Sequence, residues 1–146
     1  MAQPTFDERA DTRRMTNLAA FLLASIGAVT AAFVLLDVGT GFGDANIGQV
    51  LVMLGMAAAP ATPAVLAALA FSRRPALPAA RRFALIVAIG YGTVGLFGAW
   101  AGWATKDAVS GEARDAFAML QVIGVVLFVL SVAALLALRL AVRASR

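Results

Sequence analysis

The sequence predicts an all-α integral membrane protein, an antiparallel bundle of four transmembrane helices with both termini on the same side. Two observations support this fold class. Four apolar stretches of about twenty residues fill most of the 146-residue chain, and at 1.5 Å rise per residue each can cross a hydrocarbon core about 30 Å thick. Apolar residues make up 62% of the chain and charged residues 14%, against about 45–50% and 25% in soluble domains.

We expect residues 1–146 to form a single domain, whose transmembrane helices are these four stretches. A polar segment, residues 1–16, precedes the first helix, and a short tail, residues 139–146, follows the last. The transmembrane helices are expected over residues 17–36, 50–71, 83–104 and 117–138. Because the connections between them are short, consecutive helices should lie antiparallel.

The first stretch is interpreted as a retained helix and not as a cleaved signal peptide. The segment before it carries acidic as well as basic side chains, and the apolar run ends without a clear small-x-small cleavage pattern. Thr5-Phe6-Asp7-Glu8 fits a capping box, which predicts a short interfacial helix leading into the membrane. Within the span, Ala24 and Ala28 belong to a ridge of alanines spaced four apart, which favours close helix packing.

The second stretch is interrupted near its middle by two prolines, Pro60 and Pro63. Each proline lacks a backbone donor and crowds the preceding turn, which frees the carbonyl groups of Met56 and Ala59. Lipid cannot satisfy those carbonyls, so a neighbour, a water molecule or the hydroxyl of Thr62 must do so. The segment is therefore a candidate hinge or polar site, with a simple packing kink as the alternative.

The third stretch is rich in glycine and ends near two tryptophans. Gly95, Gly98 and Gly102 form a small-residue face that lets another helix approach closely, and the last two make a GxxxG motif. We expect this face to pack within the bundle, where the alanine ridge of the first helix offers a match. Packing against a second chain is the alternative. Trp100 and Trp103 are expected to anchor the helix at the membrane surface.

The fourth stretch contributes an amide side chain inside its span, Gln121. It is expected to hydrogen-bond across helices or to line a shallow vestibule, and it joins Pro60, Thr62 and Pro63 as a candidate polar residue. The other polar side chains of the spans are hydroxyls, those of Ser25, Thr30, Thr62, Tyr91, Thr93 and Ser131. None ionises at neutral pH, whereas proton-coupled pumps keep a buried carboxylate or histidine in the membrane.

The charges between the stretches predict the orientation. Ten arginines lie in the N-terminal segment, the second connection and the tail, but the other two connections carry only Lys106 and Arg114. Because positively charged flanks stay in the cytoplasm, we expect a multi-pass protein of the cell membrane with both termini cytoplasmic. The opposite side is acidic, with Asp37, Asp44, Asp107, Glu112 and Asp115.

The two halves of the chain align with each other at an offset of 63 residues. Chance matches are common in a sequence rich in alanine and leucine, so both coincidence and a duplicated two-helix hairpin, in the manner of transporter repeats, remain open. The matches in the first helix of each half are Leu22, Ile26, Gly27 and Thr30 with Leu85, Ile89, Gly90 and Thr93.

The residue inventory excludes several functions. The chain has no cysteine and no histidine, which removes disulfides, thiol nucleophiles and the commonest general base and metal ligand. We expect no catalysis, no cofactor, no metal and no nucleic acid, but the lipid bilayer and other membrane chains or a second copy as partners. The expected function is that of a non-catalytic membrane component (an accessory subunit, an assembly factor or a structural protein) acting through helix packing. The alternative is a small oligomeric transporter or channel with its path near the Pro60/Pro63 break.

Overall fold

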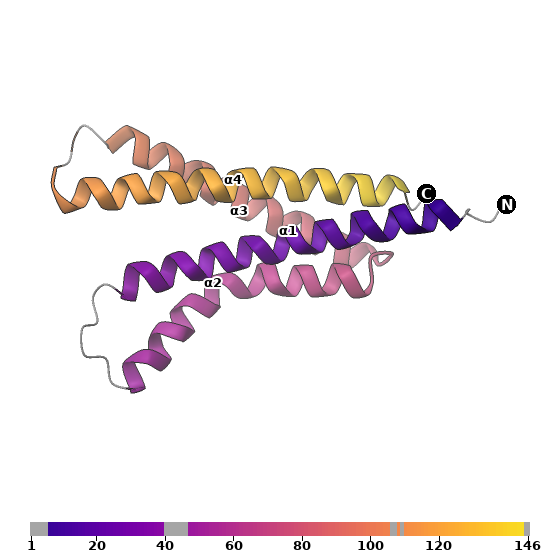
Figure 1. The fold of residues 1–146 in the computed structure, drawn as a ribbon, viewed down its shortest axis with the longest axis horizontal. Helices are drawn as coiled ribbons and strands as arrows, with labels where there is room; N and C mark the ends of the chain where they lie inside the picture. Colours follow the sequence, from indigo (N-terminus) through magenta and orange to yellow (C-terminus); the bar gives the residue numbers. More distant parts are fainter. Residues whose placement is uncertain (1–5, 40–46, 106–107, 109, 145–146) are drawn as a thin grey trace.

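The computed structural model describes residues 6–39, 47–105, 108 and 110–144, and these residues form four long helices. In chain order α1 covers Phe6–Gly39, α2 Ile47–Arg73, α3 Pro78–Thr105 and α4 Glu112–Ala144. Each contains a stretch long and apolar enough to cross a membrane. The prediction of an all-α protein with four helices able to span a membrane is therefore confirmed. Each helix returns along the one before it, so α1 starts and α4 ends at the same end of the molecule (Figure 1).

Every helix continues beyond the apolar stretch that predicts it. The polar part expected to form a separate interfacial helix is continuous with α1, and Thr5 of the expected capping box lies outside the described residues. A helix satisfies its own backbone hydrogen bonds in water as well as in lipid, so a change to polar side chains does not end it. The 34 residues of α1 span about 51 Å, more than the roughly 30 Å of the hydrocarbon core.

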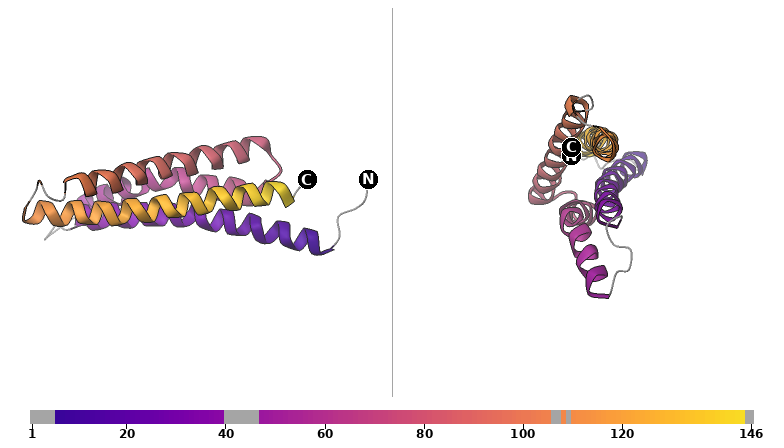
Figure 2. Two further views of the ribbon diagram at one scale, coloured as in Figure 1. Left: turned by 90° about the horizontal axis from the view of Figure 1, so that it is seen from above. Right: turned by 90° about the vertical axis from the view of Figure 1, so that its left-hand side faces the viewer.

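The chain folds as two helix hairpins that meet along α1 and α4. The largest contacts are those of α3 with α4 and of α1 with α2, followed by the contact of α1 with α4. In contrast, α1 and α3 barely touch. The end-on view in Figure 2 shows the resulting arrangement, with α4 lying next to both α1 and α3.

The interior of the bundle is built mainly from small side chains. Twelve of the eighteen buried apolar residues in the described chain are alanine, and the largest fully buried side chains are those of Phe71, Leu23 and Ile26. Lipid is as apolar as these side chains, so their burial adds little hydrophobic stabilisation. Small side chains instead bring the backbones close together, which increases the van der Waals contact between helices.

The closest approach of two backbones occurs between α3 and α4. A β-carbon added to Gly95 would lie 2.7 Å from both the carbonyl oxygen of Gly124 and the amide nitrogen of Phe128. One added to Gly124 would lie 2.6 Å from the carbonyl oxygen of Gly95. Both distances are far shorter than van der Waals contact between such atoms, so this crossing requires glycine on both helices.

The alanine ridge of α1 does not take part in this contact. Ala24 and Ala28 are exposed, and Gly95, Gly98 and Gly102 of α3 face α4 instead of α1. The expected match between the alanine and glycine faces therefore does not occur within one chain. The reason is the order of the helices around the bundle, which separates α1 from α3 by α4 on one side and α2 on the other.

The two hairpins pack through different residues. The internal alignment pairs Gly27 of α1 with Gly90 of α3. A β-carbon on Gly27 would lie 3.1 Å from the carbonyl oxygen of Ala61 on α2, whereas nothing lies within 4 Å of that position on Gly90. Aligned glycines thus have different surroundings, and a duplicated hairpin stays a hypothesis.

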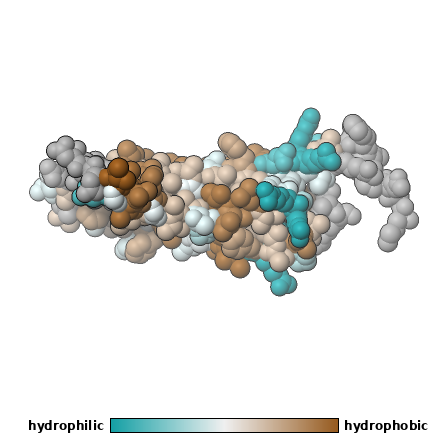
Figure 3. Space-filling view, turned by 90° about the horizontal axis from the view of Figure 1, so that it is seen from below, coloured by the Kyte–Doolittle hydropathy of each residue, from teal (hydrophilic) through white to brown (hydrophobic). Residues whose placement is uncertain are grey.

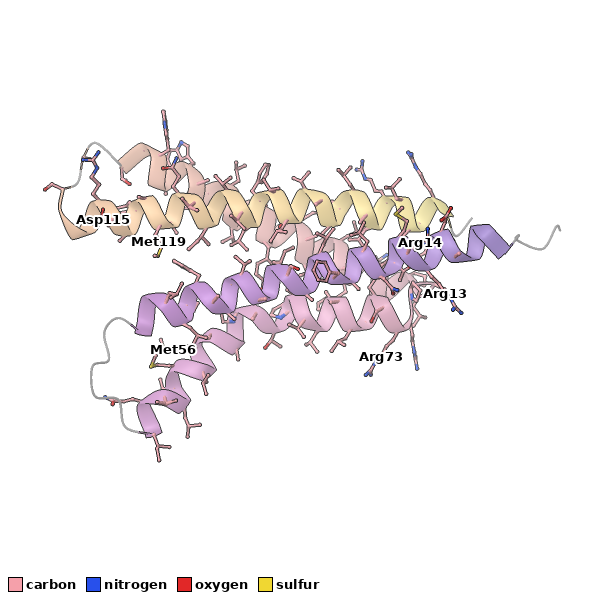
Figure 4. The ribbon with its side chains drawn as sticks, in the orientation of Figure 1. Arg13, Arg14, Met56, Arg73, Asp115 and Met119 are labelled. Carbon is pink, nitrogen blue, oxygen red and sulfur yellow. The ribbon has the colours of Figure 1, made fainter. Side chains whose placement is uncertain are left out.

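The bundle is closed at the end where α1 starts and open at the other end. The buried residues of α2 all lie between Ala57 and Phe71, and past Gly27 α1 has no buried residue in its described part. α2 bends near its middle, and its first half leans away from the other helices (Figures 1 and 2). Met56 lies on this leaning half (Figure 4).

Charged side chains gather at the closed end. Arg13, Arg14 and Arg73 lie there, and Asp115 lies at the opposite end (Figure 4). The face drawn in Figure 3 has most of its strongly hydrophilic side chains toward one end, beside a largely apolar surface. Of the acidic residues expected at the open end, Asp44 and Asp107 lie outside the described residues. The molecule therefore has different chemistry at its two ends.

Replacing Gly95 by alanine is expected to destabilise the protein, because the added methyl group meets the backbone of α4. Gly90→Ala is a matched control on the same helix, since its new methyl group meets open space. We expect Gly95→Ala to lower the free energy of unfolding by about 1–3 kcal/mol and Gly90→Ala to leave it equal or slightly raised. Unfolding in detergent micelles titrated with SDS, followed by circular dichroism, measures both. Equal stability of the two variants would contradict the tight α3–α4 crossing.

Candidate functional site

The middle of α2 carries the candidate site, where one hydrogen bond joins it to α3. Pro60 is half-buried, and Thr62 and Pro63 are exposed. The hydroxyl of Tyr91 on α3 donates a hydrogen bond to the carbonyl oxygen of Pro60. The hydroxyl of Thr62 donates to the carbonyl oxygen of Ala58 at 2.6 Å, within α2. Among the described residues, the side-chain hydrogen bond that links the proline segment to a neighbouring helix is therefore the one from Tyr91.

These hydrogen bonds reach different carbonyls from those expected. The missing N–H groups at positions 60 and 63 predict acceptors at Met56 and Ala59, but the side-chain bonds go to Ala58 and Pro60. A threonine hydroxyl in a helix ordinarily donates to the carbonyl four residues earlier, which for Thr62 is that of Ala58. The hydroxyl of Thr62 therefore follows local helix geometry and not the gap that the prolines leave.

Tyr91 and Pro60 meet because they lie at the same depth. Pro60 comes thirteen residues before α2 ends at Arg73, and Tyr91 comes thirteen residues after α3 starts at Pro78. Both are therefore about 20 Å from the connection between the two helices. Tyr91 is half-buried, and a phenol removed from water in this way usually finds an acceptor. Equal depth in a hairpin was the signal for this pair, but sequence analysis placed Tyr91 only among the polar side chains of the spans.

Gln121 lies elsewhere. A β-carbon added to Gly102 would lie 2.7 Å from the β-carbon of Gln121, so Gln121 packs against the last part of α3. Gly102 is eleven residues beyond Tyr91, which corresponds to about 16 Å along the helix. The four candidate polar residues are therefore not brought together: the prolines and Thr62 share the bend, and Gln121 belongs to the α3–α4 contact.

Ser131 is a second polar side chain near mid-depth that sequence analysis did not single out as a site residue. It is 1% exposed, and its hydroxyl oxygen has no hydrogen-bond partner among the described residues. A β-carbon on Gly92, the residue after Tyr91, would lie 3.1 Å from the β-carbon of Ser131. The same turn of α3 thus contacts α2 through Tyr91 and α4 through Gly92. The sequence feature that could have identified Ser131 is its position as a polar residue in the middle of a predicted span.

The predicted glycine face of α3 lies against α4 along its whole length. A β-carbon on Gly98 would lie 3.6 Å from the Cδ1 atom of Leu120, and one on Gly102 would lie 2.6 Å from the carbonyl oxygen of Phe117. Gly124, which completes this contact, was not singled out from the sequence. It is the one glycine in the apolar stretch of α4, and that isolation was the signal that could have identified it.

Trp100 and Trp103 are exposed near the open end of α3. The ring of Trp100 lies 5.8 Å from that of Phe97, measured between centroids, with the planes tilted by 41°. Both tryptophans thus present their rings to the surroundings of the bundle, as the expected interface anchors would.

The groups gathered at the bend are a carbonyl and hydroxyls. They can exchange hydrogen-bond partners, and Tyr91 can hold or release the proline segment of α2. A helix that lacks two backbone donors bends more easily than an intact one. These groups are therefore suited to a conformational role, in which they influence the angle between the two halves of α2.

Two hollows lie at the closed end of the bundle, away from the bend. One of about 510 Å³ lies between the end of α2 and the start of α3. The other, of about 220 Å³, has walls from all four helices. Arg81 lines the smaller hollow, and its Nε atom donates a hydrogen bond to the carbonyl oxygen of Pro75 at 2.6 Å. This bond fixes the connection between α2 and α3.

Replacing Tyr91 by phenylalanine is expected to loosen the bend, because the carbonyl of Pro60 loses its donor. We expect the free energy of unfolding to fall by about 1 kcal/mol, the scale of a hydrogen bond between membrane helices. The distance between spin labels at Leu51→Cys and Val122→Cys should also become more widely distributed, and the chain has no other cysteine. Thr93→Val is the control, since Thr93 donates within its own helix to Ile89. An unchanged distribution in Tyr91→Phe would contradict this role.

Comparison with known proteins assigns no family to this chain. No protein-family model, no curated protein and no solved structure matches it. Its function has to be argued from its own residues and contacts.

Proposed function

We propose that this protein is a non-catalytic component of the cell membrane that acts by packing against other transmembrane helices, as an accessory subunit, an assembly factor or a structural protein. The first half of α2 carries the proposal. Of residues 47–56, every one except Met53 is exposed. The bend keeps this half-helix away from the other helices (Figure 1), and the Tyr91–Pro60 hydrogen bond lies near the bend.

The leaning half of α2 has the composition of a helix-packing surface. Gly48, Gln49 and Gly55 interrupt its larger apolar side chains, and nothing lies within 4 Å of a β-carbon placed on Gly55. Small residues let a second helix approach the backbone. The exposed Ala24 and Ala28 of α1 offer another small-residue surface. A helix of another membrane chain, or of a second copy of this chain, could pack against either of these two surfaces.

The proposed orientation puts the closed, arginine-rich end of the antiparallel bundle, with both termini, in the cytoplasm. The positive charges on that side support it. Arg73 in the last turn of α2 and Arg143 in the last turn of α4 also favour their helix ends, where the helix dipole is negative. Trp100 and Trp103 would then anchor the bundle at the outer surface.

Single-cysteine cross-linking tests the proposed association. Leu51→Cys on the leaning half of α2 and Val122→Cys on α4 are a matched pair, since the two side chains are 63% and 62% exposed. Treated with a short photoactivatable maleimide in native membranes, Leu51→Cys should give a discrete cross-linked product and Val122→Cys should give much less. A product of twice the chain's mass identifies a second copy, and any other discrete mass identifies a partner chain. Equal labelling of both variants, or no product, would count against the proposal.

A second candidate function, a small oligomeric transporter or channel, is favoured by the Tyr91–Pro60 hydrogen bond. A bend held by one bond between helices can open and close a path beside it. Purified protein in liposomes should then conduct K⁺, Na⁺, Cl⁻ or a small organic cation, with a rate that changes in Tyr91→Phe. Flux equal to that of empty liposomes for each of these solutes would exclude a path for them.

A further inference from the structure

The larger hollow at the closed end has a cationic rim and an apolar wall. It lies where α2 ends and α3 begins, and its volume is about 510 Å³. None of the described residues that line it is acidic. They are Ala70, Arg73, Arg74, Leu77, Ala79, Ala80 and Phe83.

The guanidinium groups of Arg73 and Arg74 line this hollow. Neither Arg73 nor Arg74 has a side-chain hydrogen bond or ion-pair partner among the described residues. Arg81 differs, because its Nε atom is bound to the carbonyl of Pro75. A guanidinium group is a planar fork of donors that matches the oxygens of a phosphate. Arg73 and Arg74 both line the hollow, so its rim has two groups of the kind that bind phosphate.

The backbone at the start of α3 adds to the positive potential. The first four N–H positions of a helix have no partner within the helix. Here Pro78 has no N–H, and that of Arg81 donates to the carbonyl of Leu77 at 3.2 Å. The N–H groups of Ala79 and Ala80, which line the hollow, have no such acceptor among the described residues. They support the two arginines in attracting an anion.

The apolar wall of the hollow points along the helices toward the middle of the membrane. Ala70 lies one turn before Arg73 and Arg74, and Phe83 lies one turn after Ala79. The side chain of Phe83 is 38% exposed, so it is available to a ligand. Within about 5 Å along α2, the lining thus changes from guanidinium to hydrocarbon, and the α3 side adds Ala79, Ala80 and Phe83. A soluble anion would use only the rim.

We propose that this hollow binds an anionic phospholipid, with the lipid phosphate against Arg73 and Arg74 and an acyl chain along Ala70 and Phe83. Basic hollows between transmembrane helices on the cytoplasmic side suit such headgroups. Bound in this way, the lipid bridges the end of α2 and the start of α3 where their own backbone bonds are few. The site does not include the leaning half of α2, so it is tested separately from the association proposed for that half.

Native mass spectrometry of the full chain released from bilayers of phosphatidylglycerol and phosphatidylcholine tests this assignment. The variant is Arg73→Gln/Arg74→Gln, and the control is Arg139→Gln/Arg143→Gln, which removes the same charge from exposed positions on α4. Wild type and control should retain phosphatidylglycerol in preference to phosphatidylcholine, within about twofold of each other, and the Arg73/Arg74 variant should lose about tenfold of that preference. Equal preference in all three proteins, or equal loss in both variants, would overturn the proposal.

Two further measurements separate the alternatives. Glycerol phosphate, a soluble anion without acyl chains, should leave the phosphatidylglycerol bound, and its complete displacement would show that the hollow takes free phosphate instead of lipid. Phe83→Ala keeps every charge and removes the apolar wall, so it should lower lipid retention even if the double arginine variant fails to fold. Unchanged retention in Phe83→Ala would exclude the acyl-chain contact.

Discussion

The structure depends on how closely its helix backbones approach one another. Apolar side chains gain little when they leave lipid for protein, so contact between helices has to come from shape. The glycines at positions 95 and 124 let α3 and α4 touch at the backbone, and Gly27 brings α1 close to Ala61 of α2. These crossings explain why alanine fills most of the interior and why the bundle forms as two hairpins joined along α1 and α4.

The proline segment divides the molecule into two parts with different properties. Between Ala57 and Phe71, α2 packs against its neighbours, and before Ala57 it has no buried residue. The closed end therefore combines tight packing with arginine side chains and a fixed connection, which suits the binding of lipid headgroups. At the open end the first half of α2 is largely exposed in the described part of the chain, which suits association within the membrane. One hydrogen bond, from Tyr91 to Pro60, lies at the boundary between them.

The four helices could be predicted from the sequence because a stretch of twenty apolar residues in lipid has to satisfy its own backbone hydrogen bonds, which an α-helix does. Which helices pack against each other was harder to predict. The glycine face of α3 is visible in the sequence, but its partner on α4 is a single glycine, Gly124, and a ridge of several alanines on α1 resembled a better match. The equal depth of Tyr91 and Pro60 follows from the short connection, yet it requires the hairpin to be assumed first. Gln121 is polar like the others, but only its contact with Gly102, far along α3 from Tyr91, shows that it lies away from the bend.

In the view of Figure 1 the lean of α2 makes the open end broader than the arginine-rich end, whereas in the left view of Figure 2 the helices lie closer together at the open end. The two ends of the molecule therefore differ in outline: α2 extends the open end in one direction, and the arginine-rich end is more even. In a bilayer, the lipids of the two leaflets would pack against differently shaped surfaces, and the angle of a single helix sets that difference.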